Sequence, residues 1–257
     1  MMNWGIFIYF AVAAVVLSIT ASVLALFSRR KGAVTFAFLS TVILTVFIIG
    51  LWISLKRPPL RTMGETRLWY SFFAGIAGLF TYLRWRYKWI LSFSTILSTV
   101  FIVINLAKPE IHDQTLMPAL QSAWFIPHVT VYMFSYSLLG CAFLIAMVSL
   151  VKKPISDDML SAADILVYIG TAFLTFGMLS GAIWAKQAWG TFWAWDPKET
   201  WAMITWLTYL LYMHLRLYKK GRSRLLCFLL IFAFACLQMC WWGIDLLPSA
   251  QDSLHVY

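Results

Sequence analysis

The sequence predicts an all-α polytopic membrane protein with about eight transmembrane helices and an outer tryptophan-rich loop. Hydrophobic residues make up 62% of the chain and charged residues only 12%. The mean hydropathy is +0.80. Apolar runs recur along the chain, each near the roughly 20 residues that a helix needs to cross a hydrocarbon core about 30 Å thick. Because these runs fill most of the sequence, we expect a single integral membrane domain over residues 1–257.

Eight apolar runs are the expected spans. Each is interpreted as a helix because a backbone inside lipid must satisfy its own hydrogen bonds. In chain order they are residues 4–27, 33–55, 66–83, 89–107, 124–151, 163–185, 201–217 and 225–243. The third run is the weakest, since it is short and begins among charges. The first lacks a basic flank and a small-residue cleavage site, so we expect a retained helix rather than a signal peptide.

Basic residues mark alternate connections between these runs, which is the positive-inside pattern. They are Arg29, Arg30 and Lys31; Arg84, Arg86 and Lys88; Lys152 and Lys153; and Arg216, Lys219, Lys220, Arg222 and Arg224. We therefore expect both termini and the loops 56–65, 108–123 and 186–200 on the outer side. This distribution also accounts for the formal net charge of +10 without nucleic acid as a partner.

The four cysteines give no sign of redox chemistry. All lie in apolar runs and no C-x-x-C occurs, so we expect neither disulfides nor a thioredoxin-like site. Buried cysteine usually behaves as a small apolar residue. They are Cys141, Cys227, Cys236 and Cys240.

The most informative stretch, called the Trp segment here, is Trp189-Gly-Thr-Phe-Trp-Ala-Trp-Asp-Pro-Lys-Glu-Thr-Trp201, with four of the 14 tryptophans. Indole rings favour membrane interfaces. The tryptophans of this segment, however, are too dense and too close to charged residues for an interfacial preference alone to explain them. A slab of indoles suits a large flat apolar ligand such as haem. Trp189 and Trp193 share one side of a helical turn, and Phe192 and Trp195 extend the surface. We expect a short interfacial helix.

The end of the Trp segment has a local interpretation as well. Asp196-Pro197-Lys198-Glu199 matches a capping box, with Asp at the N-cap, Pro at the first helical position and Glu three residues after the cap. Asp196 and Glu199 can therefore act simply by starting the seventh span.

Three of the four histidines are candidate iron ligands. His214 lies about 20 Å below the outer end of the seventh span, and an ionisable residue inside a span suggests function. The alternative is a histidine hydrogen-bonded within the bundle or reaching toward the inner face. His128 begins the fifth span and His255 follows the last, so both are expected outside, where two imidazoles can bind one iron. Without the neighbouring Trp segment, a histidine at the position of His128 or His255 is more often an ordinary polar loop residue than a haem ligand. His112, among charges, is expected to be a solvated loop residue.

Basic residues of the outer loops are candidate partners for haem propionates, since Arg and Lys pair strongly with carboxylates. Lys186 and Lys198 flank the Trp segment. Arg57 and Arg61 are the other two candidates. Together with Lys56 they lie in an outer loop that departs from the positive-inside rule, near Glu65, and we treat that departure as a candidate functional feature.

These motifs resemble the WWD signature of haem-handling proteins in cytochrome c biogenesis, covering residues 184–201. The Asp-Pro-Lys-Glu-Thr run, followed by Trp206, Tyr209 and His214, is similar to the CcsA/ResC branch (system II) more than to CcmC or CcmF. The stretch 120–129 resembles that branch's helix with the first outer haem ligand, and 254–257 its terminal element with the second. The stretch 64–70 is loosely similar to a family element.

The resemblance implies roles for the residues that match. His128 and His255 would be axial ligands of haem b at the outer face, and His214 one ligand of a second, inner site. The Trp segment would hold the outer haem through Trp189, Phe192, Trp193, Trp195, Asp196 and Trp201. The missing inner ligand would come from a CcsB/ResB-type membrane protein.

The same resemblance implies a function. The chain would carry haem across the bacterial cytoplasmic membrane and present it for thioether attachment to the C-x-x-C-H motif of an apocytochrome c. It would be a haem lyase subunit, active with its partner, in which no residue acts as a dedicated nucleophile. Three alternatives remain: a haem exporter or chaperone, a membrane b-type cytochrome, and an ordinary bundle with an aromatic belt.

Overall fold

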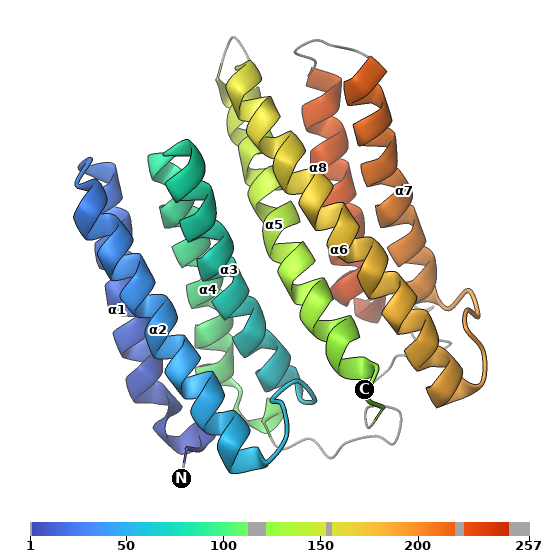
Figure 1. Cartoon of the computed structure of the whole chain (residues 1–257), viewed down its shortest axis with the longest axis horizontal. Helices are drawn as coiled ribbons and strands as arrows, with labels where there is room; N and C mark the ends of the chain where they lie inside the picture. The colour runs from blue at the N-terminus through green and yellow to red at the C-terminus, as the bar shows by residue number, and fades with distance from the viewer. Residues whose placement is uncertain (1, 113–121, 153–155, 219–223, 247–257) are drawn as a thin grey trace. The chain divides into compact units, whose positions relative to one another are not determined.

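The computed structural model describes residues 2–112, 122–152, 156–218 and 224–246 and contains eight α-helices and no strand within these ranges (Figure 1). The helices are α1 (Phe7–Leu26), α2 (Arg30–Leu55), α3 (Met63–Trp85), α4 (Lys88–Ala107), α5 (Phe125–Val151), α6 (Asp157–Trp189), α7 (Pro197–Tyr218) and α8 (Arg224–Gln238). A short turn of π-helix, Met239–Gly243, continues α8. Each expected span coincides with a helix, which confirms the all-α class.

Six of these helices are long and apolar enough to cross a membrane, namely α1 with its short N-terminal extension, α2, α4, α5, α6 and α8. The protein is therefore a multi-pass membrane protein. The other two helices carry more charge: α3 contains Glu65, Arg67 and Arg84, and α7 contains charged residues in its first and last turns. That α3 and α7 also cross the membrane stays a prediction.

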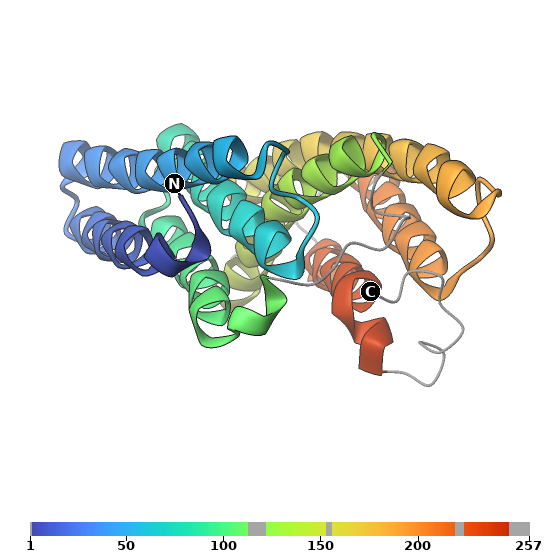
Figure 2. The same ribbon diagram turned by 90° about the horizontal axis from the view of Figure 1, so that it is seen from below.

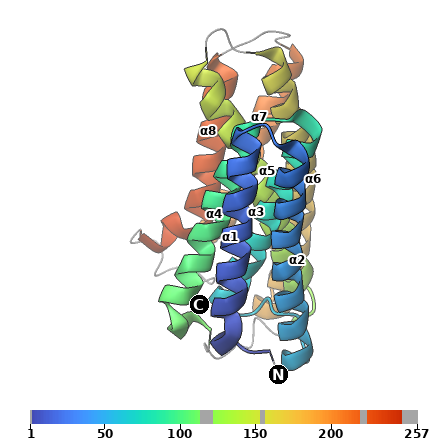
Figure 3. The ribbon, with the colours of Figure 1, turned by 90° about the vertical axis from the view of Figure 1, so that its left-hand side faces the viewer.

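The contacts of the chain fall into two compact units, residues 1–116 and 117–257. In the first unit, α1 packs on α2 and α4, and α3 packs on α4 and α2. Figure 3 shows α1 and α2 running side by side. In the second unit, α5 packs on α6 and α8, and α7 packs on α8 and α6. Whether the chain forms the expected single membrane domain depends on how these two units associate, so that expectation stays a prediction.

The first unit has an aromatic core at one end. Phe7 and Phe47 are fully buried, with ring centroids 4.9 Å apart. Trp4 packs edge-on against both rings. Leu51 and Leu68 complete this end of the core from α2 and α3. Non-directional burial of this kind stabilises the bundle without setting a chemical site.

Candidate functional site

Residues 190–196 of the Trp segment form an irregular loop between α6 and α7 (Figure 2). Gly190 ends α6 with a left-handed backbone, φ +84°, and its N–H donates to the Lys186 carbonyl at 3.1 Å. Trp195 also has a positive φ, +57°. The expected short interfacial helix is therefore wrong, because two left-handed residues within six positions cannot continue an α-helix.

The predicted roles of Asp196 and Glu199 at the start of α7 are confirmed, with the Asp196 side chain accepting from the N–H of the second helical residue. The Asp196 Oδ1 accepts a hydrogen bond from the Lys198 N–H at 2.8 Å. The Glu199 Oε2 accepts from the N–H groups of Asp196 at 3.2 Å and Ala194 at 2.7 Å. Pro197 occupies the first helical position, where no backbone donor is lost. Asp196 and Glu199 thus hold the loop against the beginning of α7.

The loop presents an aromatic surface. Phe192 is 57% exposed and Trp195 is 66% exposed. Trp193 is half-buried and meets Trp195 edge-on, with ring centroids 5.8 Å apart. The Lys186 ammonium lies 5.5 Å from the centre of the Phe192 ring. Large exposed rings gathered on one loop are typical of a binding surface rather than of a packed core.

His128 lies at the same end of the second unit, in the first turn of α5. Its Nδ1 is 2.8 Å from the Gly177 carbonyl oxygen on α6. A carbonyl can only accept, so Nδ1 carries a proton and donates this bond. The imidazole also stacks on Trp184, with centroids 5.4 Å apart. Trp184 in turn meets Trp189 edge-on at 4.8 Å, so a continuous run of rings joins His128 to the Trp segment.

Two glycines on α6 let these rings lie against the helix. A Cβ at Gly181 would be 2.6 Å from Nδ1 of His128. A Cβ at Gly177 would be 2.4 Å from the Tyr132 ring. Small residues four apart on a membrane helix allow such close approach. Gly177 and Gly181 therefore form the surface on which α5 places Tyr132 and His128.

His214 lies on the opposite side of α7 from the residues that α7 buries. Tyr209 and Tyr212 are buried, whereas His214 is exposed. Its Nδ1 is 2.7 Å from the Leu210 carbonyl of its own helix. The buried side is tied to α6 by Asp164, which accepts from the Tyr212 hydroxyl at 2.7 Å and pairs with Arg216 at 2.9 Å. His214 is 17 residues into α7, about 25 Å from its start, so it lies far from the end of the unit that carries His128.

Residues 6–250 match the family model described as "Cytochrome C assembly protein". The chain belongs to this family. Its relatives are named cytochrome c biogenesis protein CcsA. The protein of Marchantia polymorpha is 29% identical over 268 residues, covering 83% of each chain. That of Pelargonium hortorum is 31% identical over 280 residues, covering 90% of this chain and 86% of the relative. The expected CcsA-type membership is confirmed.

Two further matches are longer proteins. The CcsA of Chlamydomonas reinhardtii is 38% identical over 174 residues, which cover 63% of this chain and 48% of the relative. The solved structure of the cytochrome c haem lyase CcmF superposes with a TM-score of 0.72 at 17% identity, covering 96% of this chain and 50% of CcmF. The chain thus spans about half the length of these two proteins. The CcmF likeness shows a shared fold.

The other predicted site residues of this family member have different outcomes. His255 lies outside the described residues, so its place as the second outer ligand stays a prediction. Trp201 is half-buried in the first turn of α7. Lys186 donates to the Gly190 carbonyl at 2.7 Å, which closes the end of α6. The Trp segment and His128 are brought to one end of the second unit, whereas His214 is not.

The departure from the positive-inside rule has a structural cause. Both guanidinium nitrogens of Arg57 donate to the Glu65 carboxylate, at 2.9 and 2.8 Å. The same carboxylate accepts from the N–H groups of Arg61 and Thr62. Glu65 is 1% exposed and closes a capping box at the start of α3. The Arg57 guanidinium is therefore used to neutralise a buried carboxylate.

His112 is not the solvated loop residue that we expected. Its ring is half-buried and stacks on Trp4, with centroids 3.9 Å apart and planes 4° apart. Gly64 makes room for it, since a Cβ there would be 2.6 Å from the imidazole. The short helix Pro109–Ile111, which contacts α4, comes directly before His112. Charged neighbours in the sequence therefore concealed an aromatic packing role.

Sequence reasoning missed Trp184, Gly177 and Asp164. The Gly177-x-x-x-Gly181 spacing is a usable signal, because it marks close helix approach in membranes. Asp164, an acid at the start of the apolar run 163–185, is another. Trp184 carried no such signal, because its role depends on α5 packing against α6.

Proposed function

We propose that the chain carries haem across the membrane and presents it at the outer face for covalent attachment to apocytochrome c, acting with a CcsB/ResB-type partner. One observation carries the proposal. The His128 imidazole, with Nδ1 bonded to the Gly177 carbonyl, lies at the same end of the second unit as the exposed rings of the Trp segment. A metal-binding histidine typically donates its other ring N–H to such a carbonyl.

In this proposal His128 binds the iron of haem b from one side through Nε2, and His255 binds it from the other. Phe192 and Trp195 supply apolar area for the porphyrin, and Trp189 and Trp193 support them. Two axial imidazoles suit a stable haem site. Asp196 and Trp201 hold the loop in place at the start of α7, so their contribution is to shape the surface.

The reaction at this surface is an addition. Each cysteine thiol of the C-x-x-C-H motif adds across a haem vinyl group. A carbon–sulfur bond forms, the vinyl double bond becomes a single bond, and the thiol proton ends on the neighbouring vinyl carbon. No oxidant or reductant is consumed in that step. The chain contributes by holding haem with its vinyl edge accessible, since positioning is how a protein serves such chemistry.

The inner site needs a second protein. His214 is exposed on α7 beside Leu207 and Leu211, which are also exposed. An imidazole among leucines is costly in lipid, whereas against a partner helix that supplies a second ligand it becomes half of a haem site. We propose that haem enters from the inner side, pauses at His214 and then reaches His128. The proposed location is the bacterial cytoplasmic membrane, with both termini and the Trp segment outside.

The test is coexpression with a candidate CcsB/ResB-type protein and a c-type apocytochrome, scored by covalent haem staining. The purified complex should show a Soret band, and His128→Gly combined with His255→Gly should abolish attachment. If no haem copurifies and the double variant still matures cytochrome c, the proposal fails. Quinol-coupled electron transfer without attachment would instead favour a b-type cytochrome.

A further inference from the structure

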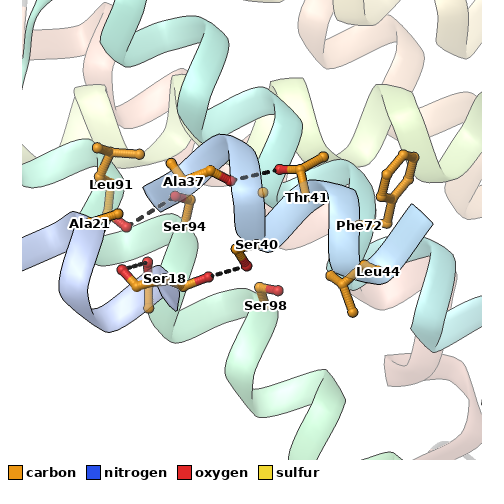
Figure 4. Close-up of a pocket in the computed structure, with 12 residues that line it drawn as sticks. Ser18, Ala21, Ala37, Ser40, Thr41, Leu44, Phe72, Leu91, Ser94 and Ser98 are labelled. Carbon is orange, nitrogen blue, oxygen red and sulfur yellow. Dashed lines mark hydrogen bonds between the residues drawn. The ribbon is translucent and has the colours of Figure 1, made fainter. Parts of the chain in front are cut away.

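A small cavity lies inside the first unit, bordered by all four of its helices (Figure 4). Its lining is rich in hydroxyl groups. They belong to Ser18, Ser40, Thr41, Ser94, Thr95 and Ser98. About 20 Å³ is open to the centre of a water-sized sphere. One water molecule needs roughly 10–15 Å³ by this measure and two to four polar partners.

The cavity lies deep between the helix ends. Ser40 is ten residues into α2 and Ser98 is ten residues into α4. At 1.5 Å per residue, both are about 15 Å from the start of their helices. That is close to the middle of a hydrocarbon core about 30 Å thick. Hydroxyl groups at this depth must find partners in the protein or in trapped water.

Most of the lining hydroxyls have a fixed partner. The Ser40 hydroxyl donates to the Ala14 carbonyl at 2.8 Å. Ser40 has only one proton, so it must accept from the Ser18 hydroxyl, 2.7 Å away. Thr41 donates to the carbonyl of Ala37, one turn earlier. Ser94 and Thr95 likewise reach backbone carbonyls, of Leu91 and Ser18.

Ser98 is the exception. It is only 6% exposed, it lines the cavity, and Figure 4 shows its side chain next to that of Ser40. Its hydroxyl makes no hydrogen bond to any residue of the described ranges. Ser18 and Ser40 each keep at least one lone pair that no bond above uses, because a hydroxyl oxygen can accept twice.

We infer that this cavity is a binding site for an ordered water molecule. The water accepts the Ser98 proton and donates to the hydroxyl oxygens of Ser18 and Ser40. The water joins α1, α2 and α4 in the middle of the membrane, because the Ser98 hydroxyl on α4 makes no direct hydrogen bond to Ser18 on α1 or Ser40 on α2. This inference concerns the first unit alone and does not depend on the proposed haem chemistry.

Gly75 on α3 offers a way to fill the site. A Cβ there would meet only the Thr41 hydroxyl, at 4.0 Å, which is ordinary contact. Gly75→Ala therefore adds a methyl group at the cavity wall without a clash. Ser98→Ala removes the hydroxyl and leaves the space. Thr99→Val is the matched control, since Thr99 is the next residue on α4 and does not line the cavity.

The experiment is X-ray radiolytic footprinting of the full chain in lipid nanodiscs, read by mass spectrometry. Radicals formed from a trapped water oxidise the nearest side chain, and Phe72 lines the cavity. Phe38 on α2, 58% exposed on the outside of the unit, is the reference ring. Wild type should modify Phe72 several-fold faster than Phe38. Gly75→Ala and Ser98→Ala should both bring the Phe72 rate down toward that of Phe38, whereas Thr99→Val should not.

Two results would overturn the inference. One is a wild-type Phe72 rate no higher than that of Phe38. The other is an unchanged Phe72 rate in both Gly75→Ala and Ser98→Ala. Either result leaves cytochrome c maturation as a separate question, because none of these residues belongs to the proposed haem sites.

Discussion

Replacing Gly181 by alanine should displace the His128 imidazole while leaving the Trp segment untouched. The new Cβ would be 2.6 Å from Nδ1 and 2.7 Å from Cε1 of the ring. Ordinary contacts begin at 3.4 Å, so the ring must move by about 0.8 Å. That shift strains or breaks the 2.8 Å bond between Nδ1 and the Gly177 carbonyl.

The energetic cost follows from two effects. Overpacking a well-filled contact costs about 1–3 kcal/mol, and the lost hydrogen bond costs about 1 kcal/mol more. For the proposed chemistry the displacement matters more than the stability. A misplacement of about 1 Å can reduce the rate of a positioned reaction about 100-fold. We therefore expect covalent attachment to fall about 10- to 100-fold in Gly181→Ala.

The assay is haem staining of a reporter cytochrome c, together with the Soret band of the purified complex. Gly170→Ala is the matched control. Its Cβ would be 2.7 Å from Leu139, so it crowds the same α5–α6 contact without touching His128. If the two variants lose attachment equally, Gly181 has no special role. If His128→Gly is itself active, the proposed ligand is wrong and the Gly181 result has no bearing.

Three further substitutions test other parts of the second unit. Asp164→Ala should lower stability by about 3 kcal/mol, because it leaves the Arg216 charge unpaired. Asp164→Asn also removes the charge, so it should cost nearly as much in the same thermal unfolding assay, and a much smaller cost would contradict the ion-pair account. Trp195→Gly should stabilise the loop by about 1 kcal/mol by relieving a left-handed backbone, yet lose haem from the purified complex; full haem retention would favour the aromatic-belt alternative. Glu199→Ala should cost about 1 kcal/mol as a lost cap, with a smaller loss in Glu199→Gln, and no difference between the two would contradict the capping role.

The helices were predictable because length and apolarity are properties of the chain alone. The sixth span was expected over 163–185, whereas α6 runs from Asp157 to Trp189. The extra residues at its ends include Asp157, Asp158 and Lys186, which a search for apolar residues leaves out. A helix is held by its own backbone hydrogen bonds, so α6 continues beyond the apolar run until Gly190 stops it.

Only the parts of the candidate site that depend on neighbouring residues in the sequence were predictable. The capping box of α7 depends on four consecutive residues, so sequence spacing was enough to find it. The packing of His128 on Trp184 depends on the pairing of α5 with α6, which no single segment encodes. The prediction for His112 failed for the same reason, because its surroundings in the fold are not its neighbours in the sequence. Its charged neighbours indicated solvent, and its stacking on Trp4 required residues more than 100 positions apart.

The two sides of α7 differ in what holds them. Asp164 ties the side that carries Tyr212 and Arg216 to α6, so α7 cannot turn His214 inward. The Leu210 carbonyl accepts a hydrogen bond from the Nδ1–H of His214. The exposed ring lies on a side of α7 formed by apolar residues such as Leu207 and Leu211. This exposed side of α7 is where the proposal places a helix of the partner protein, and the second ligand that completes the inner site would come from that helix.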